Sequence, residues 1–188
     1  MAADRTTGTT GATTGSSRAP LRHAEREARR LADVVHGRLV EAGRTVAVAE
    51  SLTGGLISAY LTAAPGTSTT FRGGLVVYST DLKHVMAGVR ADSLARYGAV
   101  HPLVATQMAR GVRRRLHADC GLAVTGVAGP GEQDTRPVGE VYVAVATDRD
   151  AHARQFRFDG GRAQIRMSTV IAGLEQLIEA VQAILRRA

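Results

Sequence analysis

Short apolar runs alternate along this chain with longer runs in which apolar residues recur every three or four positions. The first kind of run predicts buried β-strands, and the second predicts amphipathic helices. Strands are predicted at 45–49, 74–78, 121–125, 139–147 and 154–158. Helices are predicted from Pro20 to Gly43, at 56–64, 81–87, 92–97 and 102–117, and over the apolar stripe from Val170 to Leu185. This alternation favours one sheet with helices on both faces.

The order of these runs predicts an α/β fold, a three-layer α/β/α sandwich with a mostly parallel sheet. The last two strands are close in sequence, so we expect them to form an antiparallel hairpin at the edge. Residues 1–18 (MAADRTTGTTGATTGSSR) contain almost nothing apolar to bury, which predicts a disordered N-terminal tail. Residues 19–188 are predicted to form a single domain.

Charge and cysteine content narrow the functional classes. Lys plus Arg number 24 against 17 Asp plus Glu, and the net charge of +7 favours anionic partners, either phosphorylated small molecules or nucleic acid. The one cysteine, Cys120, excludes an intrachain disulfide and is consistent with a reducing cytoplasm. No continuous apolar run reaches membrane-spanning length and no secretory signal is visible, so we expect a cytoplasmic protein without a membrane partner.

Three polar segments follow predicted strands. Glu50 to Gly55 (ESLTGG) follows the first strand, Tyr78 to Lys83 (YSTDLK) the second, and Thr125 to Gly131 (TGVAGPG) the third. Open α/β sheets bind their ligands outside the carboxyl ends of the strands. We therefore expect the three segments to form one site.

Ser51 has two interpretations. A serine just before a helix is a common N-cap, because its hydroxyl accepts a hydrogen bond from the first turn. It is also a candidate nucleophile, because Gly54 and Gly55 are expected to present bare backbone N–H groups. Such groups at a helix N-terminus stabilise a phosphate or the oxyanion of an acyl-transfer intermediate.

A nucleophilic serine needs a base, and Lys83 is the candidate. It is the only lysine beside 23 arginines, and burial would lower the pKa of its amine enough for it to accept a proton. We therefore expect Lys83 to be buried and within hydrogen-bond reach of Ser51. Tyr78 is a candidate for relaying a proton or orienting the lysine. The alternatives are an ordinary exposed helical lysine and a tyrosine packed in the sheet.

Further residues are candidates for ligand binding. The loop from Gly126 to Gly131 could admit a phosphate or form a tight turn, and Arg162 and Arg166, one helical turn apart, could clamp a phosphate. The six histidines are too scattered for a metal site or a catalytic triad, and His101 is a candidate helix-start residue. No metal or other cofactor is predicted.

Together these motifs resemble the CinA C-terminal domain family, whose enzymatic members are nicotinamide-nucleotide amidases (NMN deamidases). The matching segments, in the family's order, are AESLTGG, PGTSTTFRGGLVVYSTDLK, AGV, YGAV, MARGV, VTGVAGPG and RPVGEVYVA. They extend over about residues 31–185. The resemblance implies a hydrolase of the pyridine nucleotide cycle and NAD salvage, which converts nicotinamide mononucleotide to nicotinate mononucleotide and ammonia without a metal.

The resemblance also implies residue roles. The family's serine, lysine and tyrosine correspond to Ser51, Lys83 and Tyr78, which implies a Ser-Lys dyad assisted by the tyrosine and an acyl-enzyme that water hydrolyses. The residues expected to bind substrate are Thr53, Gly54, Gly55, Ser79, Gly126, Ala128, Gly129, Arg162 and Arg166. The chain departs from the family pattern with Leu52 for Cys, Thr80 for Asn, His101 for Ser and Arg136 for Lys, while the catalytic trio is intact.

Two other functions remain open. The domain could bind a nucleotide in a regulatory role related to competence or DNA damage, without turnover. The basic charge could serve nucleic acid, but the absence of a recognised DNA or RNA motif and the few aromatic residues disfavour that partner. We expect a homodimer, as for many small metabolic enzymes.

Overall fold

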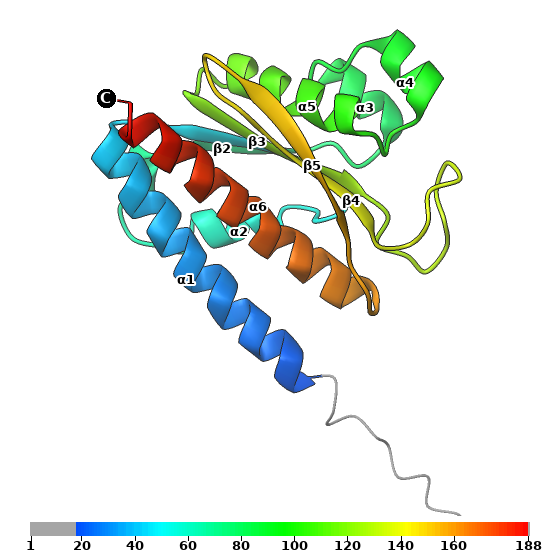
Figure 1. The fold of residues 1–188 in the computed structure, drawn as a ribbon, viewed down its shortest axis with the longest axis horizontal. Helices are drawn as coiled ribbons and strands as arrows, with labels where there is room; N and C mark the ends of the chain where they lie inside the picture. Colours follow the sequence, from blue (N-terminus) through cyan, green and yellow to red (C-terminus); the bar gives the residue numbers. More distant parts are fainter. Residues whose placement is uncertain (1–17, 188) are drawn as a thin grey trace, which may run out of the picture.

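One five-stranded sheet covered by helices makes up the computed structural model, which describes residues 18–187 (Figure 1). The strands are β1 (Val46–Glu50), β2 (Phe71–Val76), β3 (Cys120–Gly126), β4 (Glu140–Ala146) and β5 (Ala151–Arg157). The helices are α1 (Arg18–Ala42), α2 (Leu56–Leu61), α3 (Thr80–Val85), α4 (Ala91–Tyr97), α5 (Pro102–Arg115) and α6 (Arg162–Leu185), and a short 3₁₀ helix covers Thr67–Thr69.

The strands are arranged in the order β2-β1-β3-β4-β5. The ladders of β1 with β2 and with β3 are parallel, whereas β4 runs antiparallel to both β3 and β5. The predicted α/β sandwich with an antiparallel edge hairpin is confirmed, and the sheet is mixed rather than wholly parallel. Because β4 returns beside β3, the loop 127–139 turns at the edge where β1 and β3 end.

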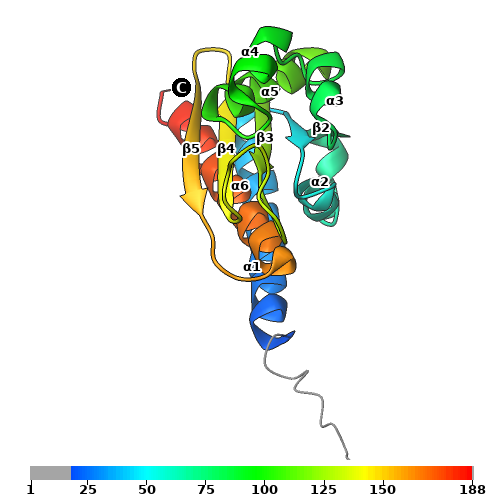
Figure 2. The same ribbon diagram turned by 90° about the vertical axis from the view of Figure 1, so that its right-hand side faces the viewer.

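Two apolar cores lie on the two faces of the sheet. One is shared with α1, α2 and α6, and the other is formed mainly with α5, on the side where α3 and α4 also lie (Figures 1 and 2). Every residue of β1, β3 and β4 is buried, as expected for strands covered on both faces. Burial is only partial along β5, which is an edge strand.

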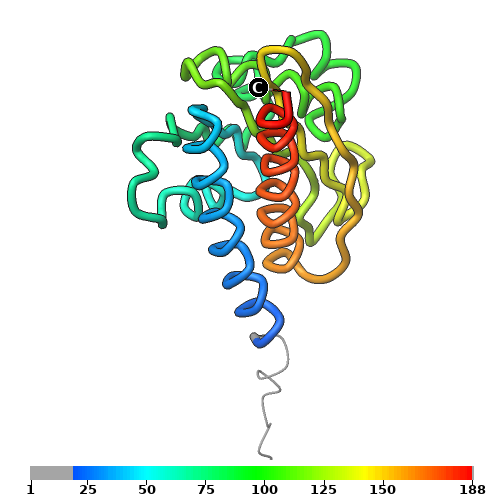
Figure 3. Tube along the Cα trace, turned by 60° about the vertical axis from the view of Figure 1, so that its left-hand side comes forward, coloured from blue at the N-terminus to red at the C-terminus, as the bar shows by residue number. Residues whose placement is uncertain are grey.

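Helices α1 and α6 lie side by side on one face, and the first turns of α1 extend beyond the first turn of α6 (Figure 3). By length and composition alone, α6 could cross a membrane. It instead packs as a core helix here, with Ile165, Val170 and Leu174 fully buried. Burial against the sheet and α1 accounts for its apolar composition.

The boundaries of most elements differ from the predicted ones by a few residues, and the largest difference is at α6, which begins at Arg162 rather than at Val170. Helix α2 ends at Leu61 rather than at 64. Directly after Leu61, the hydroxyl of Thr62 donates to the Ser58 carbonyl. Strand β2 starts at Phe71 rather than at 74, and the 3₁₀ helix was not predicted. Of the predicted N-terminal tail, Arg18 belongs to α1, and residues 1–17 lie outside the described residues.

Candidate active site at the carboxyl edge of the sheet

A cavity of about 270 Å³ lies where β1, β2 and β3 end. Six predicted site residues line it: Ser51, Tyr78, Gly126, Ala128, Gly129 and Arg162. The lining also includes Val127 and Gly131 of the predicted binding loop, and Leu52, Glu132 and Gln133, which were not predicted as site residues. Leu52 belongs to the ESLTGG segment, whereas Glu132 and Gln133 follow the glycine-rich segment and no motif marked them.

Ser51 directly follows β1 and is 8% exposed. Its N–H donates to the Val124 carbonyl at 3.1 Å, which continues the ladder between β1 and β3 by one residue. The N-cap interpretation of Ser51 is wrong, because α2 starts at Leu56 and its N-cap is Gly55. The hydroxyl of Ser51 makes no hydrogen bond to any residue from 18 to 187, and the residue faces the cavity.

The fully buried Glu50 caps α2 instead. One carboxylate oxygen accepts hydrogen bonds from the N–H groups of Gly55 and Ile57, at 3.0 and 3.1 Å. The other accepts from the N–H and the hydroxyl of Ser58, at 2.8 and 2.7 Å. A carboxylate at this end of a helix also complements the helix dipole. The N-terminus of α2 is therefore already occupied by an anion from the chain itself.

The expectation that Gly54 and Gly55 present bare N–H groups is consequently wrong. Gly55 donates to Glu50, and Gly54 donates to the Ser51 carbonyl at 3.1 Å. The N–H groups of Leu52 and Thr53 instead donate to no residue within the described range. Within the described residues, the unpaired donors of this turn are thus the two amides that follow Ser51.

Arg166 of α6 forms hydrogen bonds with the turn that follows Ser51. Its Nε donates to the Leu52 carbonyl at 3.0 Å and its Nη2 donates to the Thr53 carbonyl at 2.6 Å. In a trans peptide the carbonyl and the next N–H point in opposite directions, so this contact directs the Thr53 N–H away from α6. Arg162 lines the cavity and Arg166 does not, so the structure does not place the two together as a phosphate clamp.

Lys83 is 1% exposed, which confirms the predicted burial. Its Nζ donates to the carbonyls of Val77 and Tyr78, at 2.9 and 3.2 Å. Desolvation lowers the pKa of Lys83 to about 8, while the charges of Asp134 and Asp81 act in the opposite direction.

The predicted hydrogen bond between Lys83 and Ser51 is not made in this structure. The two carbonyls at the end of β2 take the donors of the amine. Strand β2 neighbours β1, so the strand end whose carbonyls hold the amine lies beside the strand end that carries Ser51. Lys83 does not belong to the cavity lining.

Tyr78 and Arg162 also line the cavity and contact each other. Arg162 begins α6, and its two terminal nitrogens donate to the Tyr78 hydroxyl and to the Gly129 carbonyl, each at 2.8 Å. Tyr78 is 56% exposed, so the alternative that it packs within the sheet is wrong. Its hydroxyl contacts Arg162, while its carbonyl contacts Lys83.

The glycine-rich loop supplies further donors. Ala128, Gly129 and Gly131 line the cavity, and their N–H groups donate to no acceptor between residues 18 and 187. Other predicted binding residues, namely Thr53, Gly54, Gly55 and Ser79, lie outside the cavity lining. Within residues 18–187, no group of three or more His, Cys, Asp or Glu side chains could hold a metal ion.

The fold and the cavity define a three-layer α/β domain with a serine, a buried amine and free amides gathered at the carboxyl edge of its sheet. The model of the CinA C-terminal domain matches residues 28–181, and the chain belongs to this family. A CinA-like protein of Frankia casuarinae is 46% identical over 145 residues, which cover 77% of this chain and 34% of the relative. A CinA-like protein of Acidobacterium capsulatum is 50% identical over 125 residues, which cover 66% and 30%.

Solved structures agree with this assignment. A competence/damage inducible protein, CihA, from Agrobacterium tumefaciens superposes with a TM-score of 0.79 and 38% identity, covering 83% of this chain and 96% of that one. The chain spans about a third of the length of the curated relatives it matches.

Proposed function

We propose that this domain is an amidohydrolase that converts nicotinamide mononucleotide to nicotinate mononucleotide and ammonia. The observation that carries the proposal is the position of Lys83. The only lysine of the chain is buried at the end of β2, with a pKa of about 8, next to the strand end that presents Ser51 to a cavity. Family membership supports the class of domain, and the identity of the substrate follows the family resemblance.

In the proposed reaction, the Ser51 hydroxyl attacks the carboxamide carbon and Lys83 accepts the hydroxyl proton. The carbonyl oxygen gains the negative charge, and backbone N–H groups beside the serine stabilise it. As the C–N bond breaks, Lys83 returns the proton to the leaving ammonia. Water then attacks the acyl-enzyme and releases the carboxylate product and the free serine.

The same cavity suits the phosphate of the substrate. Arg162 contributes a guanidinium to the lining, and the free amides of Ala128 and Gly129 lie on the adjacent loop. Charge-assisted hydrogen bonds from such donors are the stronger kind. We therefore assign Arg162 to the phosphate and the amides beside Ser51 to the oxyanion, in a cytoplasmic enzyme.

The mechanism requires the amine of Lys83 to approach the serine. In the structure, the amine is bound to the carbonyls of Val77 and Tyr78. Catalytic hydrogen bonds are often long in free enzymes and form in the substrate complex. We propose that substrate binding turns the amine from these carbonyls toward Ser51.

The contact of Lys83 with two carbonyls also favours a second candidate function. If the amine remains there with ligand bound, the cavity binds a nucleotide without turnover, as a regulatory domain would. The two functions differ in ammonia release, because only hydrolysis produces it.

The test is ammonia release from nicotinamide mononucleotide by the purified protein and by the variants S51A and K83M. We expect turnover by the wild type and a loss of at least 1,000-fold in either variant, because nucleophile and base act as a unit. The matched control is R26Q, which removes an exposed positive charge from α1 and should leave the rate unchanged. Binding of the nucleotide by well-folded wild type without ammonia release would favour the regulatory function instead.

A further inference from the structure

A second basic region lies at the edge of the sheet opposite to Ser51. Residues 147–150 connect β4 to β5, Arg44 precedes β1, and Arg187 follows α6. Because β4 runs antiparallel to β3, the turn between β4 and β5 lies beside the amino ends of β1 and β3. The region is therefore separated from the candidate active site by the length of the strands.

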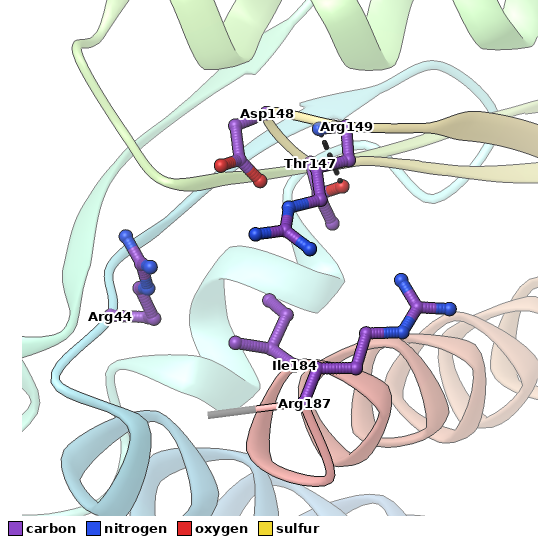
Figure 4. Close-up of a pocket in the computed structure, with 6 residues that line it drawn as sticks. All are labelled: Arg44, Thr147, Asp148, Arg149, Ile184 and Arg187. Carbon is purple, nitrogen blue, oxygen red and sulfur yellow. Dashed lines mark hydrogen bonds between the residues drawn. The ribbon is translucent and has the colours of Figure 1, made fainter.

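Two adjoining hollows of about 170 Å³ each are found here, and we call them the amino-edge hollows. The first lies between Arg44, Arg149 and Arg187, whose side chains are drawn around it in Figure 4. The second lies between Arg149 and three arginines of α5, Arg110, Arg113 and Arg114. Thr147, Asp148 and Arg149 line both hollows.

Most of these arginines have no side-chain partner among residues 18–187. Arg44 pairs with Asp119 at 3.0 Å. The side chains of the other five make no salt bridge and no hydrogen bond to any residue from 18 to 187; they are Arg110, Arg113, Arg114, Arg149 and Arg187. Arginines in the last turn of α5 complement the helix dipole, but this does not explain Arg149, which lies in a β-turn.

The turn holds the backbone of Arg149 in place. The Thr147 hydroxyl accepts from the N–H groups of Arg149 and Asp150, at 3.3 and 3.2 Å, and the Thr147 N–H donates to the Asp150 carbonyl at 2.7 Å. This network fixes Arg149 between the two hollows. Asp148 lines both hollows and Asp150 lines the second, and these carboxylates oppose the binding of an anion there.

We propose that the amino-edge hollows form a binding site for a chain of two or more phosphoryl groups, with Arg149 between them. Guanidinium groups bind phosphate oxygens in a bidentate manner, and five of them here are free to do so. Each hollow has the volume of roughly five or six waters, which suits a phosphoryl group. Among residues 18–187, no aromatic side chain lines either hollow, so the site offers no stacking surface for a base and its strongest contacts are with phosphates.

The experiment is calorimetric titration of the full chain with inorganic tripolyphosphate, and separately with ATP, at near-physiological salt. The R149Q variant should weaken tripolyphosphate binding at least tenfold, while R26Q, which removes the same charge from α1, should change it by less than twofold. The D148N variant should tighten binding severalfold, because it removes an opposing carboxylate. A gain in affinity cannot result from a folding defect.

Two results would overturn the proposal. One is equal weakening by R149Q and R26Q, which would mean that only the net charge matters. The other is binding that R162Q abolishes and R149Q does not, which would place the anion in the cavity beside Ser51. The ATP titration identifies the source of the phosphates: equal affinities point to the phosphate chain alone, and tighter ATP binding points to a nucleotide. Either result supports the proposed site if the R149Q variant weakens the binding.

Discussion

Lys83 is the residue whose chemistry depends most on its surroundings. A buried ammonium is costly unless acceptors surround it, and two strand-end carbonyls partly offset that cost. Desolvation remains the largest influence, so the pKa of Lys83 is about 8 instead of above 10. The amine can therefore gain and lose a proton close to neutral pH.

The pH dependence of the reaction should report this pKa. We expect kcat/KM for ammonia release to rise with pH, and to level off above about pH 8, because the base must be deprotonated in the free enzyme. Initial rates at low substrate concentration between pH 6 and 9.5 give the profile. A flat profile in a chemistry-limited assay would contradict the role of Lys83 as the base.

The free energy of unfolding should also depend on the protonation of Lys83. Between about pH 8 and 10.5, the unfolded chain keeps the proton on Lys83 and the folded chain loses it, so the free energy of unfolding rises with pH in this range. We expect the wild type to gain roughly 2–3 kcal/mol relative to K83M over this window. Urea titrations of both proteins at several pH values measure the difference.

The comparison with K83M removes the effects of other buried groups. Burial also raises the pKa of Cys120 to about 12, and in this case stability falls as the pH rises, because the unfolded thiol ionises first. That contribution is common to both proteins and cancels. A difference that does not change with pH would show that Lys83 has an ordinary pKa in the folded state.

At the scale of elements, the turn after β1 is held from two sides. Glu50 binds the first turn of α2, and Arg166 of α6 binds the carbonyls of Leu52 and Thr53. These contacts leave the two amides after Ser51 without acceptors inside the described chain. The orientation of the donors therefore depends on a helix distant in sequence.

We predict that R166Q lowers kcat by about 10- to 100-fold with little change in KM, because misaligned donors stabilise the oxyanion less. Steady-state kinetics of ammonia release measure both parameters. The contrasting variant is R162Q, which should mainly raise KM if Arg162 binds the substrate phosphate. If R166Q raised KM and left kcat unchanged, Arg166 would be a substrate-binding residue instead.

Close packing between α5 and the segment after α3 fixes the position of the helix that carries Lys83. A Cβ atom added at Gly111 would lie 1.8 Å from the Ala87 carbonyl oxygen, and this atom cannot move without shifting backbone. We predict that G111A destabilises the protein by about 1–3 kcal/mol. The control G37A, where a Cβ meets nothing within 4 Å, should be neutral or stabilising by up to about 1 kcal/mol. Thermal unfolding of both variants compares them.

The elements themselves were largely predictable, because runs such as Val46–Ala49 and the stripe in α6 show their period directly. The burial of Lys83 was also predictable, since a single lysine at a strand end stands out among arginines. The contacts of the turn after Ser51, with Glu50 and with Arg166, were not predictable. Glu50 and Arg166 act through hydrogen bonds to backbone atoms. These contacts depend on how the elements pack, and no residue pattern in the sequence indicates them.

At the scale of the whole molecule, the described domain begins at α1, and its packing against α6 starts near Leu21. Residues 1–17 contain few apolar side chains that could add to this packing. We predict that a chain starting at residue 18 keeps the unfolding temperature within about 2 °C and the same kcat/KM. A lower unfolding temperature would mean that these residues contribute to the fold.

The reversal of direction between β3 and β4 has a consequence for how such domains diversify. A parallel crossover would carry the chain away from the cavity, whereas this hairpin tethers both ends of the 127–139 loop to adjacent strands at the rim. Changes of sequence or length in this loop would alter the lining of the cavity, to which residues 127–129 and 131–133 contribute, and would leave the strand register in place. Transplanting this one segment between homologues is therefore a practical route to exchanging ligand preference on an unchanged scaffold.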